Sequence, residues 1–169
     1  MALRSSLVGL LLVGCPLLWI AGCASNGVQT STSFDPLATF PSQASFVWDD
    51  AASRLPADAR IAELDLGPLI QQAANEAFAV RGYRRVASPP ADYRLSYEVG
   101  ENRWYGPEGE TSVVSVSLLL RDAKSDRRVW TGFGRAEVQE GLSREERGRR
   151  LRSAFDKLLE GFPPSGASK

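Results

Sequence analysis

Few side chains in this sequence could carry out catalysis at neutral pH. The chain has 169 residues and no histidine, and histidine is the side chain most used for proton transfer near pH 7 and the commonest neutral metal ligand. The two cysteines, Cys15 and Cys23, both lie near the start of the chain. We therefore expect no thiol nucleophile, no disulfide, no metal centre and no cofactor in the folded domain.

The chemistry that the cysteines do indicate is lipidation. Met1 to Arg4 provides a short positive start, and the apolar run from Leu7 to Ile20 is shorter than the roughly 20 residues that a stable spanning helix needs. The run ends in Ile20-Ala21-Gly22-Cys23, which resembles a lipobox, the motif in which the cysteine receives diacylglycerol. This resemblance implies a lipoprotein signal peptide over residues 1–22 and an acylated Cys23 that anchors the chain to a membrane.

Two alternatives to an acylated Cys23 are also compatible with this leader. Leu12-Val13-Gly14-Cys15 fits the same pattern, but cleavage there would leave Pro16 directly after the cysteine and expose an apolar stub to water. The other alternative is an ordinary signal peptide in which Cys23 has no role. We favour Cys23. Because Ala24 follows it, and not the Asp that typically retains Gram-negative lipoproteins in the inner membrane, we expect an outer-membrane anchor that faces the periplasm.

Length and charge limit the domain and its partners. Lys plus Arg equals Asp plus Glu, at 20 each, and this balance argues against a nucleic-acid partner. The length suits one globular domain with a modest core, which we expect over residues 44–164, followed by a tail over 165–169. The stretch 23–43 is expected to be the acylated cysteine and its tether, in which residues 28–34 fit a flexible tether or an edge strand equally well.

Apolar periodicity predicts the elements of this domain. Alternation and β-branched or aromatic content predict strands over residues 44–49, 93–99, 114–120 and 129–138. A helix is expected to begin at Gly67-Pro68 and to end at Gly82. Residues 100–111 contain several Gly and Pro and are expected to form a loop that is too long for a tight turn.

A last helix is predicted by a capping box, Ser143 with Glu146, and by an apolar stripe made of Leu151, Ala154, Phe155, Leu158, Leu159 and Phe162. Gly132 and Gly134 lack side chains on the face of Trp130, which suggests that a helix approaches there. The predicted order is strand, helix, three strands, helix. We expect an α+β domain: a mostly antiparallel sheet of four to five strands with two helices packed on one face.

Several short motifs, taken in order, match a known family. They are Phe34-Asp35-Pro36, Phe46-Val47-Trp48, Gly82-Tyr83-Arg84, Ala91-Asp92-Tyr93, Val129-Trp130-Thr131-Gly132 and Phe162-Pro163-Pro164. From about Val28 to Pro164 the chain resembles the bacterial lipoprotein family numbered forty-one thirty-six among the domains of unknown function. The resemblance implies an envelope location and this fold class, and it brings no active site with it.

Acidic and basic side chains that could suggest chemistry have simpler structural explanations. Asp92 opens a strand after two prolines, where Asp commonly accepts hydrogen bonds from backbone amides. Glu145 and Glu146 fit the preference for acids in the first turn of a helix. The arginines of the last helix could meet anionic lipid headgroups, but the glutamates among them favour a solvated face; these are Arg144, Arg147, Arg149, Arg150 and Arg152.

Trp104 and Tyr105 are the candidate partner-binding residues. They lie in the stretch 101–110, in a loop where large aromatic side chains either fold back on the core or contact a partner. The sequence is compatible with both folding back on the core and contact with a partner.

The leading hypothesis is a lipid-anchored, non-enzymatic interaction or structural module at the periplasmic side of the outer membrane. It would contact the membrane through Cys23 and could contact an envelope protein. One alternative is an accessory lipoprotein of an envelope assembly or transport system, which rests on analogy of fold alone. A less favoured alternative is a hydrolase with paired carboxylates or a Ser-Lys pair, for which the chain offers only Lys124, Lys157 and Lys169.

Replacing Cys23 tests the anchor. We expect C23A to abolish incorporation of labelled palmitate, because the lipobox thiol is the only site of acyl transfer in this hypothesis. C15A is the matched control and should incorporate the label as the parent does. Labelling of C23A at the parental level would contradict the assignment.

Overall fold

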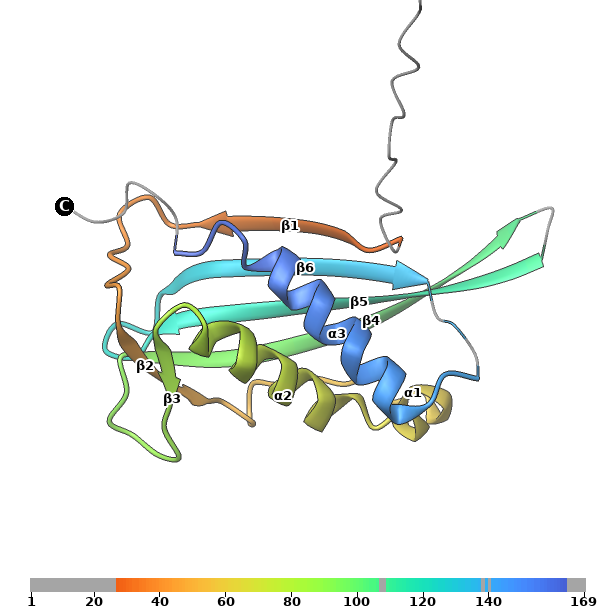
Figure 1. The fold of residues 1–169 in the computed structure, drawn as a ribbon, viewed down its shortest axis with the longest axis horizontal. Coiled ribbons are helices and arrows are strands. Elements are labelled where there is room, and N and C mark those ends of the chain that lie inside the picture. Colours follow the sequence, from red (N-terminus) through yellow and green to blue (C-terminus); the bar gives the residue numbers. More distant parts are fainter. Residues whose placement is uncertain (1–26, 107–108, 138, 140, 164–169) are drawn as a thin grey trace, which may run out of the picture.

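The computed structural model describes residues 27–106, 109–137, 139 and 141–163 (Figure 1). These residues form six strands and three helices. The strands are β1 (Gln29–Phe34), β2 (Ala44–Trp48), β3 (Tyr83–Arg85), β4 (Tyr93–Gly106), β5 (Gly109–Asp122) and β6 (Arg128–Glu137). The helices are α1 (Ala59–Glu63), α2 (Leu66–Ala79) and α3 (Arg144–Leu158). In the described part of the chain, every helix is too short or too polar to cross a membrane.

The strands form one mixed sheet in the order β1-β6-β5-β4-β2-β3. Pairing is antiparallel from β1 to β4, whereas β2 runs parallel to both β3 and β4. Helices α2 and α3 cover one face of this sheet (Figure 1). The α+β prediction is confirmed in outline, but the expected four to five strands and two helices were too few.

The parallel half of the sheet follows from the position of α2. A helix that joins β2 to the neighbouring β3 acts as a crossover connection, and such connections make the two strands parallel. Strand β3 has three residues, too few for an alternation pattern to reveal it. At the other edge, residues 29–34 form β1, which pairs with β6 and places Phe34 opposite Trp130. Of the two interpretations that the sequence left open for residues 28–34, the edge strand is the one observed.

Helix α2 begins two residues earlier than predicted. Its N-cap is Asp65, at φ 49°, and Gly67 lies inside the first turn. A Cβ at Gly67 would lie 2.9 Å from the Tyr97 hydroxyl oxygen, so the missing side chain allows the helix to approach β4. Gly82 follows the helix at φ 83°, the left-handed conformation that was predicted for it.

Helix α3 begins at the predicted capping box. The Glu146 amide donates to Ser143 Oγ at 3.2 Å, and the Ser143 amide donates to Glu146 Oε2 at 2.9 Å. At the other end, Arg81 donates from Nη2 to the Asp156 carbonyl oxygen at 3.0 Å and from Nη1 to the Ala77 carbonyl oxygen at 2.7 Å. One guanidinium thus satisfies carbonyl groups at the ends of α2 and α3, which have no partner within their own helix.

Most of the loop expected over residues 100–111 is strand. Residues 100–106 belong to β4 and residues 109–111 to β5, and the two strands pair as far as Gly106 with Gly109. The last residue of β6, Glu137, pairs with Val113, so beyond this point β4 and β5 pair only with each other in the described chain. Figure 1 shows this two-stranded arm extending past the body of the sheet. The prediction was wrong because the polar residues here carry no apolar alternation.

The two glycines on the helix side of β6 differ in their surroundings. A Cβ at Gly132 would lie 2.3 Å from Cη2 of Trp130 and 2.8 Å from Cδ2 of Leu158, which confirms the close approach of a helix at this position. A Cβ at Gly134 would meet nothing within 4 Å. The expectation of close approach is therefore wrong for Gly134, where the space above the sheet is open.

These two glycines form a matched pair for a stability test. We expect G132A to lower the free energy of unfolding by about 1 to 3 kcal/mol, because the new methyl group overpacks a filled part of the core. G134A should leave it within about 0.5 kcal/mol of the parent, because nothing opposes the methyl group. Urea unfolding measures both. Equal effects of the two substitutions would contradict the packing described for β6.

Candidate functional site: a cavity beside α3 and an extended hairpin

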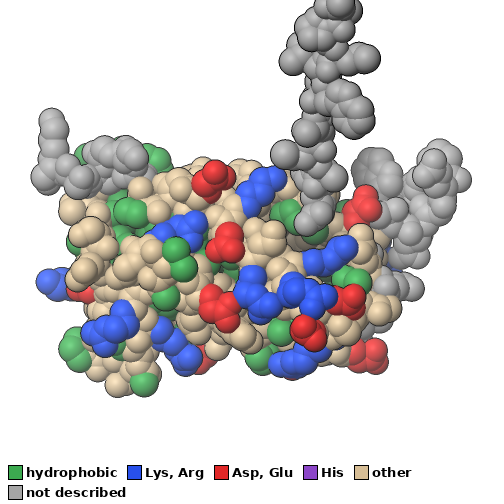
Figure 2. Space-filling view, in the orientation of Figure 1, with side chains coloured by type: hydrophobic (Ala, Val, Ile, Leu, Met, Phe, Trp, Pro, Cys, Tyr) green, Lys and Arg blue, Asp and Glu red, His purple; other side chains and the backbone are tan. Residues whose placement is uncertain are grey.

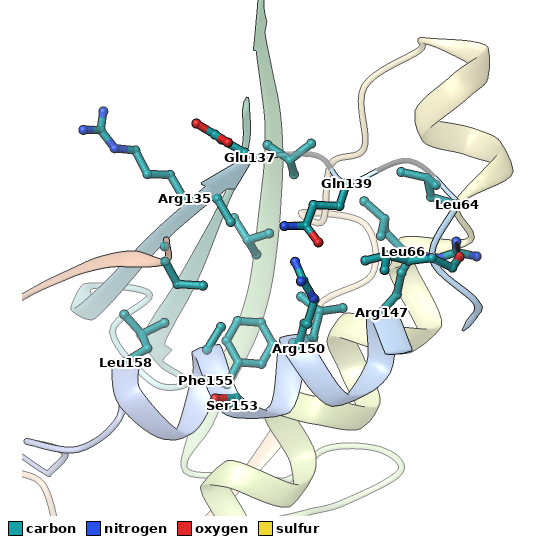
Figure 3. Close-up of a pocket in the computed structure, with 18 residues that line it drawn as sticks. Leu64, Leu66, Arg135, Glu137, Gln139, Arg147, Arg150, Ser153, Phe155 and Leu158 are labelled. Atoms are coloured by element: carbon teal, nitrogen blue, oxygen red, sulfur yellow. Dashed lines mark hydrogen bonds between the residues drawn. The ribbon is translucent and has the colours of Figure 1, made fainter. Parts of the chain in front are cut away.

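A cavity of 160 Å³ lies between α3 and the sheet (Figure 3). Its floor is the helix side of β5 and β6, where Gly134 leaves space. The side chains around it are mostly apolar and include Leu66, Val114, Val116, Leu151, Phe155 and Leu158. Val28, next to the first residue of β1, also lines it. The arrangement provides a mostly apolar space beside α3.

Charged residues around this cavity are mainly basic: Arg135, Arg147 and Arg150, against Glu137. Arg135 points away from the cavity (Figure 3) and donates from Nε to Gln29 Oε1 at 2.7 Å. Arg150 extends from α3 toward Gln139 (Figure 3). Arg147 donates from Nη1 to the Leu142 carbonyl oxygen, whereas its buried Nε has no hydrogen-bond partner among the residues described. Such an orphaned polar atom is uncommon in a folded protein.

The other arginines of α3 are engaged in ion pairs. Arg144 pairs with Asp65, Arg149 with Glu145 at 2.8 Å, and Arg152 with Glu76 at 3.7 Å. Figure 2 shows Lys and Arg side chains beside Asp and Glu side chains on this face of the molecule. For these three residues a solvated face with balanced charge agrees with the sequence interpretation. Arg147 and Arg150 differ, because they line the cavity.

The candidate partner-binding residues lie on the arm. In the backbone pairing, Trp104 is opposite Thr111 and Tyr105 is opposite Glu110, and the side chains of both aromatic residues lie outside what the structure describes. Near the base of the arm, Arg103 Nη2 lies 2.7 Å from Asp58 Oδ2, so an ion pair ties the arm to the segment before α1. Cys23 also lies outside the described residues.

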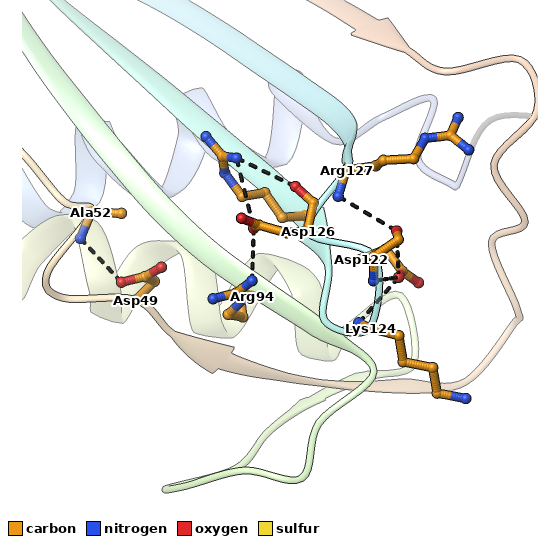
Figure 4. Close-up of polar contacts among 9 residues, drawn as sticks. Asp49, Ala52, Arg94, Asp122, Lys124, Asp126 and Arg127 are labelled. Atoms are coloured by element: carbon orange, nitrogen blue, oxygen red, sulfur yellow. Dashed lines mark hydrogen bonds and ion pairs between the residues drawn. The ribbon is translucent and has the colours of Figure 1, made fainter.

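The carboxylates at the opposite end of the sheet serve local structure. Asp92 Oδ2 accepts from both the backbone amide and the hydroxyl of Ser45 at 2.7 Å. These bonds, the backbone one first, lower the pKa of Asp92. Asp122 Oδ1 accepts from the amides of Ser125 at 2.7 Å and Lys124 at 3.1 Å (Figure 4), and these contacts lower its pKa in the same way.

Two buried tyrosines are likewise structural, and the sequence did not single out their hydroxyl groups. Tyr83 donates to the Pro41 carbonyl oxygen at 2.7 Å, and Tyr93 donates to the Thr39 carbonyl oxygen at 2.8 Å. Burial raises the pKa of both phenols, that of Tyr93 to about 12. Both therefore stay protonated at neutral pH and fasten the segment before β2 to the sheet.

The model of the family described as "Domain of unknown function (DUF4136)" matches residues 30–164. The chain belongs to this family. The match runs from the second residue of β1 to beyond the end of α3, so the DUF4136 unit includes the edge strand and the extended hairpin. No curated protein matches the chain.

Solved structures resemble this DUF4136 domain in fold. Two structures of the PelC dodecamer from Paraburkholderia phytofirmans match with a TM-score of 0.51 at 19% and 18% identity, and they cover 78% of this chain and 94% of PelC. The lipoprotein GNA1162 from Neisseria meningitidis matches with a TM-score of 0.43 at 16% identity, covering 70% of this chain and 99% of that one.

Asp92 provides a test of the structural role of the carboxylates. D92N should lower the free energy of unfolding at pH 7 by about 1 kcal/mol, because a charged acceptor of two hydrogen bonds is lost. The folded-state pKa of Asp92 is below its ordinary value of 3.8, so its contribution is complete above that pH and is lost as the pH falls through the folded-state pKa. The parent and D92N should therefore converge in acid.

Urea unfolding at several pH values measures this convergence. E63Q is the control, because Glu63 is an exposed residue of α1, and it should stay within about 0.5 kcal/mol of the parent. A D92N variant as stable as the parent at pH 7 would show that the Ser45 contact contributes nothing.

Proposed function

We propose that this DUF4136 protein is a lipid-anchored envelope lipoprotein that acts as a non-enzymatic interaction module, and that the arm formed by β4 and β5 is its contact surface. The observation that carries the proposal is the length of the arm beyond the last pairing of β6. A two-stranded ribbon is at best marginally stable in water without further packing. Its unpaired edges offer backbone donors and acceptors to a partner strand.

The aromatic pair on the arm supports the same role. Trp and Tyr are enriched among the residues that contribute most to binding between proteins. Because Trp104 and Tyr105 are not in a loop that could fold over the core but in a strand of the arm, partner contact is favoured over folding back. The ion pair between Arg103 and Asp58 limits the movement of the base and presents the arm in one direction.

The proposed anchor places the arm near a membrane. Val28 is the fifth residue after Cys23, a reach of at most roughly 17 Å in an extended chain. Gln29 pairs with Arg135 near the end of β6, so the chain enters the sheet at the end from which the arm extends (Figure 1). Ala24 favours the periplasmic side of the outer membrane as the location.

The fold suggests which kind of partner the arm could contact. PelC, which shares the fold, is a dodecamer, so a second copy of this chain is one candidate partner beside another envelope protein. A role as an accessory of envelope assembly or transport is compatible with either partner.

The placement of polar groups argues against the alternative of a hydrolase. Asp92 and Asp122 accept hydrogen bonds from backbone amides, and Lys157 Nζ donates to the Val28 carbonyl oxygen at 3.3 Å.

The double variant W104A/Y105A tests the proposal. We expect its melting temperature to stay within about 5 °C of the parent, because the core is supplied by α2, α3 and the body of the sheet. Crosslinks formed by the full chain in outer-membrane fractions should be lost, and the mass of the parental crosslinked product distinguishes a second copy from a different protein. V80A is the control. Val80 is exposed at the C-terminal end of α2, so this variant should keep the crosslinks.

Two outcomes would contradict the proposal. If the double variant unfolds, or keeps every crosslink, the arm is not the contact surface. If the chain is recovered with inner-membrane markers, the proposed location is wrong.

A further inference from the structure

We infer that the cavity between α3 and β6 binds the acyl chain of a diffusible, single-chain anionic amphiphile such as a fatty acid. The alkyl chain would occupy the apolar space above Gly134, and the anionic head would lie at Arg150 and Arg147. This goes beyond the proposed contact surface, and it rests on the proposed function only for the nearness of a membrane.

The size and lining of the cavity suit an alkyl chain. Its volume of 160 Å³ is close to that of an engineered cavity of about 150 Å³ that binds benzene, so it has room for a short stretch of an alkyl chain whose remainder would extend from the opening. The walls are formed by Leu66, Val116, Leu151 and Phe155. Water would find few hydrogen-bond partners on such walls, whereas methylene groups gain free energy when they leave water for them.

The space exists because of specific small residues. On the helix side of β6, the residues that follow Trp130 at every second position are Gly132, Gly134 and Ala136. Leu158 and the indole ring fill the space above Gly132, but nothing fills the space above Gly134. Ala154 is the small residue of α3 that lines the same space. An ordinary core would carry larger side chains here.

The charges at the cavity favour an anionic head. Arg147 and Arg150 both line the cavity, and the described chain places neither in an ion pair, unlike Arg144, Arg149 and Arg152. The buried Nε of Arg147 lacks a partner. A carboxylate can accept charge-assisted hydrogen bonds from guanidinium groups. Two arginines beside an apolar cavity therefore match a molecule with an alkyl chain and a negative end.

The same charges argue against the chain's own anchor as the occupant. The acyl groups on a lipobox cysteine are joined through esters and an amide, which carry no negative charge for Arg150 to bind. Val28 lines the cavity, so with Cys23 as the anchor the opening lies within about 17 Å of the membrane surface. A diffusible amphiphile from that membrane would have a short path to the cavity.

Photo-crosslinking of the full acylated chain in phosphatidylcholine vesicles tests the inference. The probe is a dodecanoic acid that carries a diazirine on its alkyl chain. We expect labelled peptides from α3 and β6, competition by unlabelled dodecanoate, and weaker competition by 1-dodecanol. Labelling spread evenly over the surface of the protein would overturn the inference.

Two pairs of variants separate the parts of the site. G134V and A136L fill the cavity from the sheet and should lower the labelling at least tenfold, whereas G161V, at a position where a Cβ also meets nothing within 4 Å, should label as the parent does. R150Q should weaken competition by dodecanoate about tenfold and leave competition by 1-dodecanol unchanged. R149Q, on the same helix, is its control. Undiminished labelling of both folded filling variants would overturn the alkyl site, and R150Q behaving like R149Q would overturn the anionic head.

The anchor and the arm are tested separately. If the acylated chain labels weakly and C23A labels strongly, the occupant is the chain's own acyl group and the diffusible ligand is wrong. W104A/Y105A should label as the parent does, because the arm lies outside the cavity. Failure of the contact surface thus shows in the protein crosslinks, and failure of the cavity shows in the lipid label.

Discussion

The ring of Phe162 lies among four other aromatic rings. Its centroid is 5.6 Å from that of Phe40, 5.3 Å from Phe78, 5.0 Å from Tyr83 and 5.2 Å from Trp130. These partners come from the segment before β2, from α2, from β3 and from β6, so one ring joins both layers of the domain and both halves of the sheet. Edge-to-face aromatic contacts at such distances add to the free energy of burying the rings, and the position of α3 on the sheet depends on this cluster.

The cluster fixes only one end of α3. Near it, Leu158 packs against Gly132 and the helix is held to the sheet. One step along β6, Gly134 meets no side chain, and the cavity begins. The capping box secures the other end of the helix by local hydrogen bonds that do not draw it to the sheet. Toward that end α3 contacts α2, through the Arg144–Asp65 ion pair and the buried Gly148, and not the sheet. A helix held to the sheet at one end only, over a strand of small residues, leaves an apolar space, and this explains why the cavity is beside α3.

Features with local causes could be predicted from the sequence. The capping box at Ser143 needs only its own turn, and the apolar alternation of β4 and β5 near Leu95 and Leu118 reports one buried face. Features that depend on distant partners could not. Strand β3 exists because Tyr83 is buried against rings from other elements, and the arm exists because backbone pairing continues past the last buried residue. The cavity depends on what is absent above Gly134, and the sequence pattern alone suggested a filled contact there.

The two ends of the sheet differ in what their polar groups contact, although each has one buried arginine Nε, of Arg94 or Arg147, without a partner among the described residues. At one end, backbone amides donate to the carboxylates of Asp92 and Asp122, and Figure 4 shows those of Asp122. At the opposite end lie the unpaired ribbon edges, the cavity and the orphaned Nε of Arg147, and there the chain enters the sheet at Val28. A buried polar atom without a partner, such as Arg147 Nε, is costly, and a ligand that bonds to it relieves the cost. With Cys23 as a short anchor, that end would be held close to the bilayer, where partners and ligands that lie in or on the membrane can reach it.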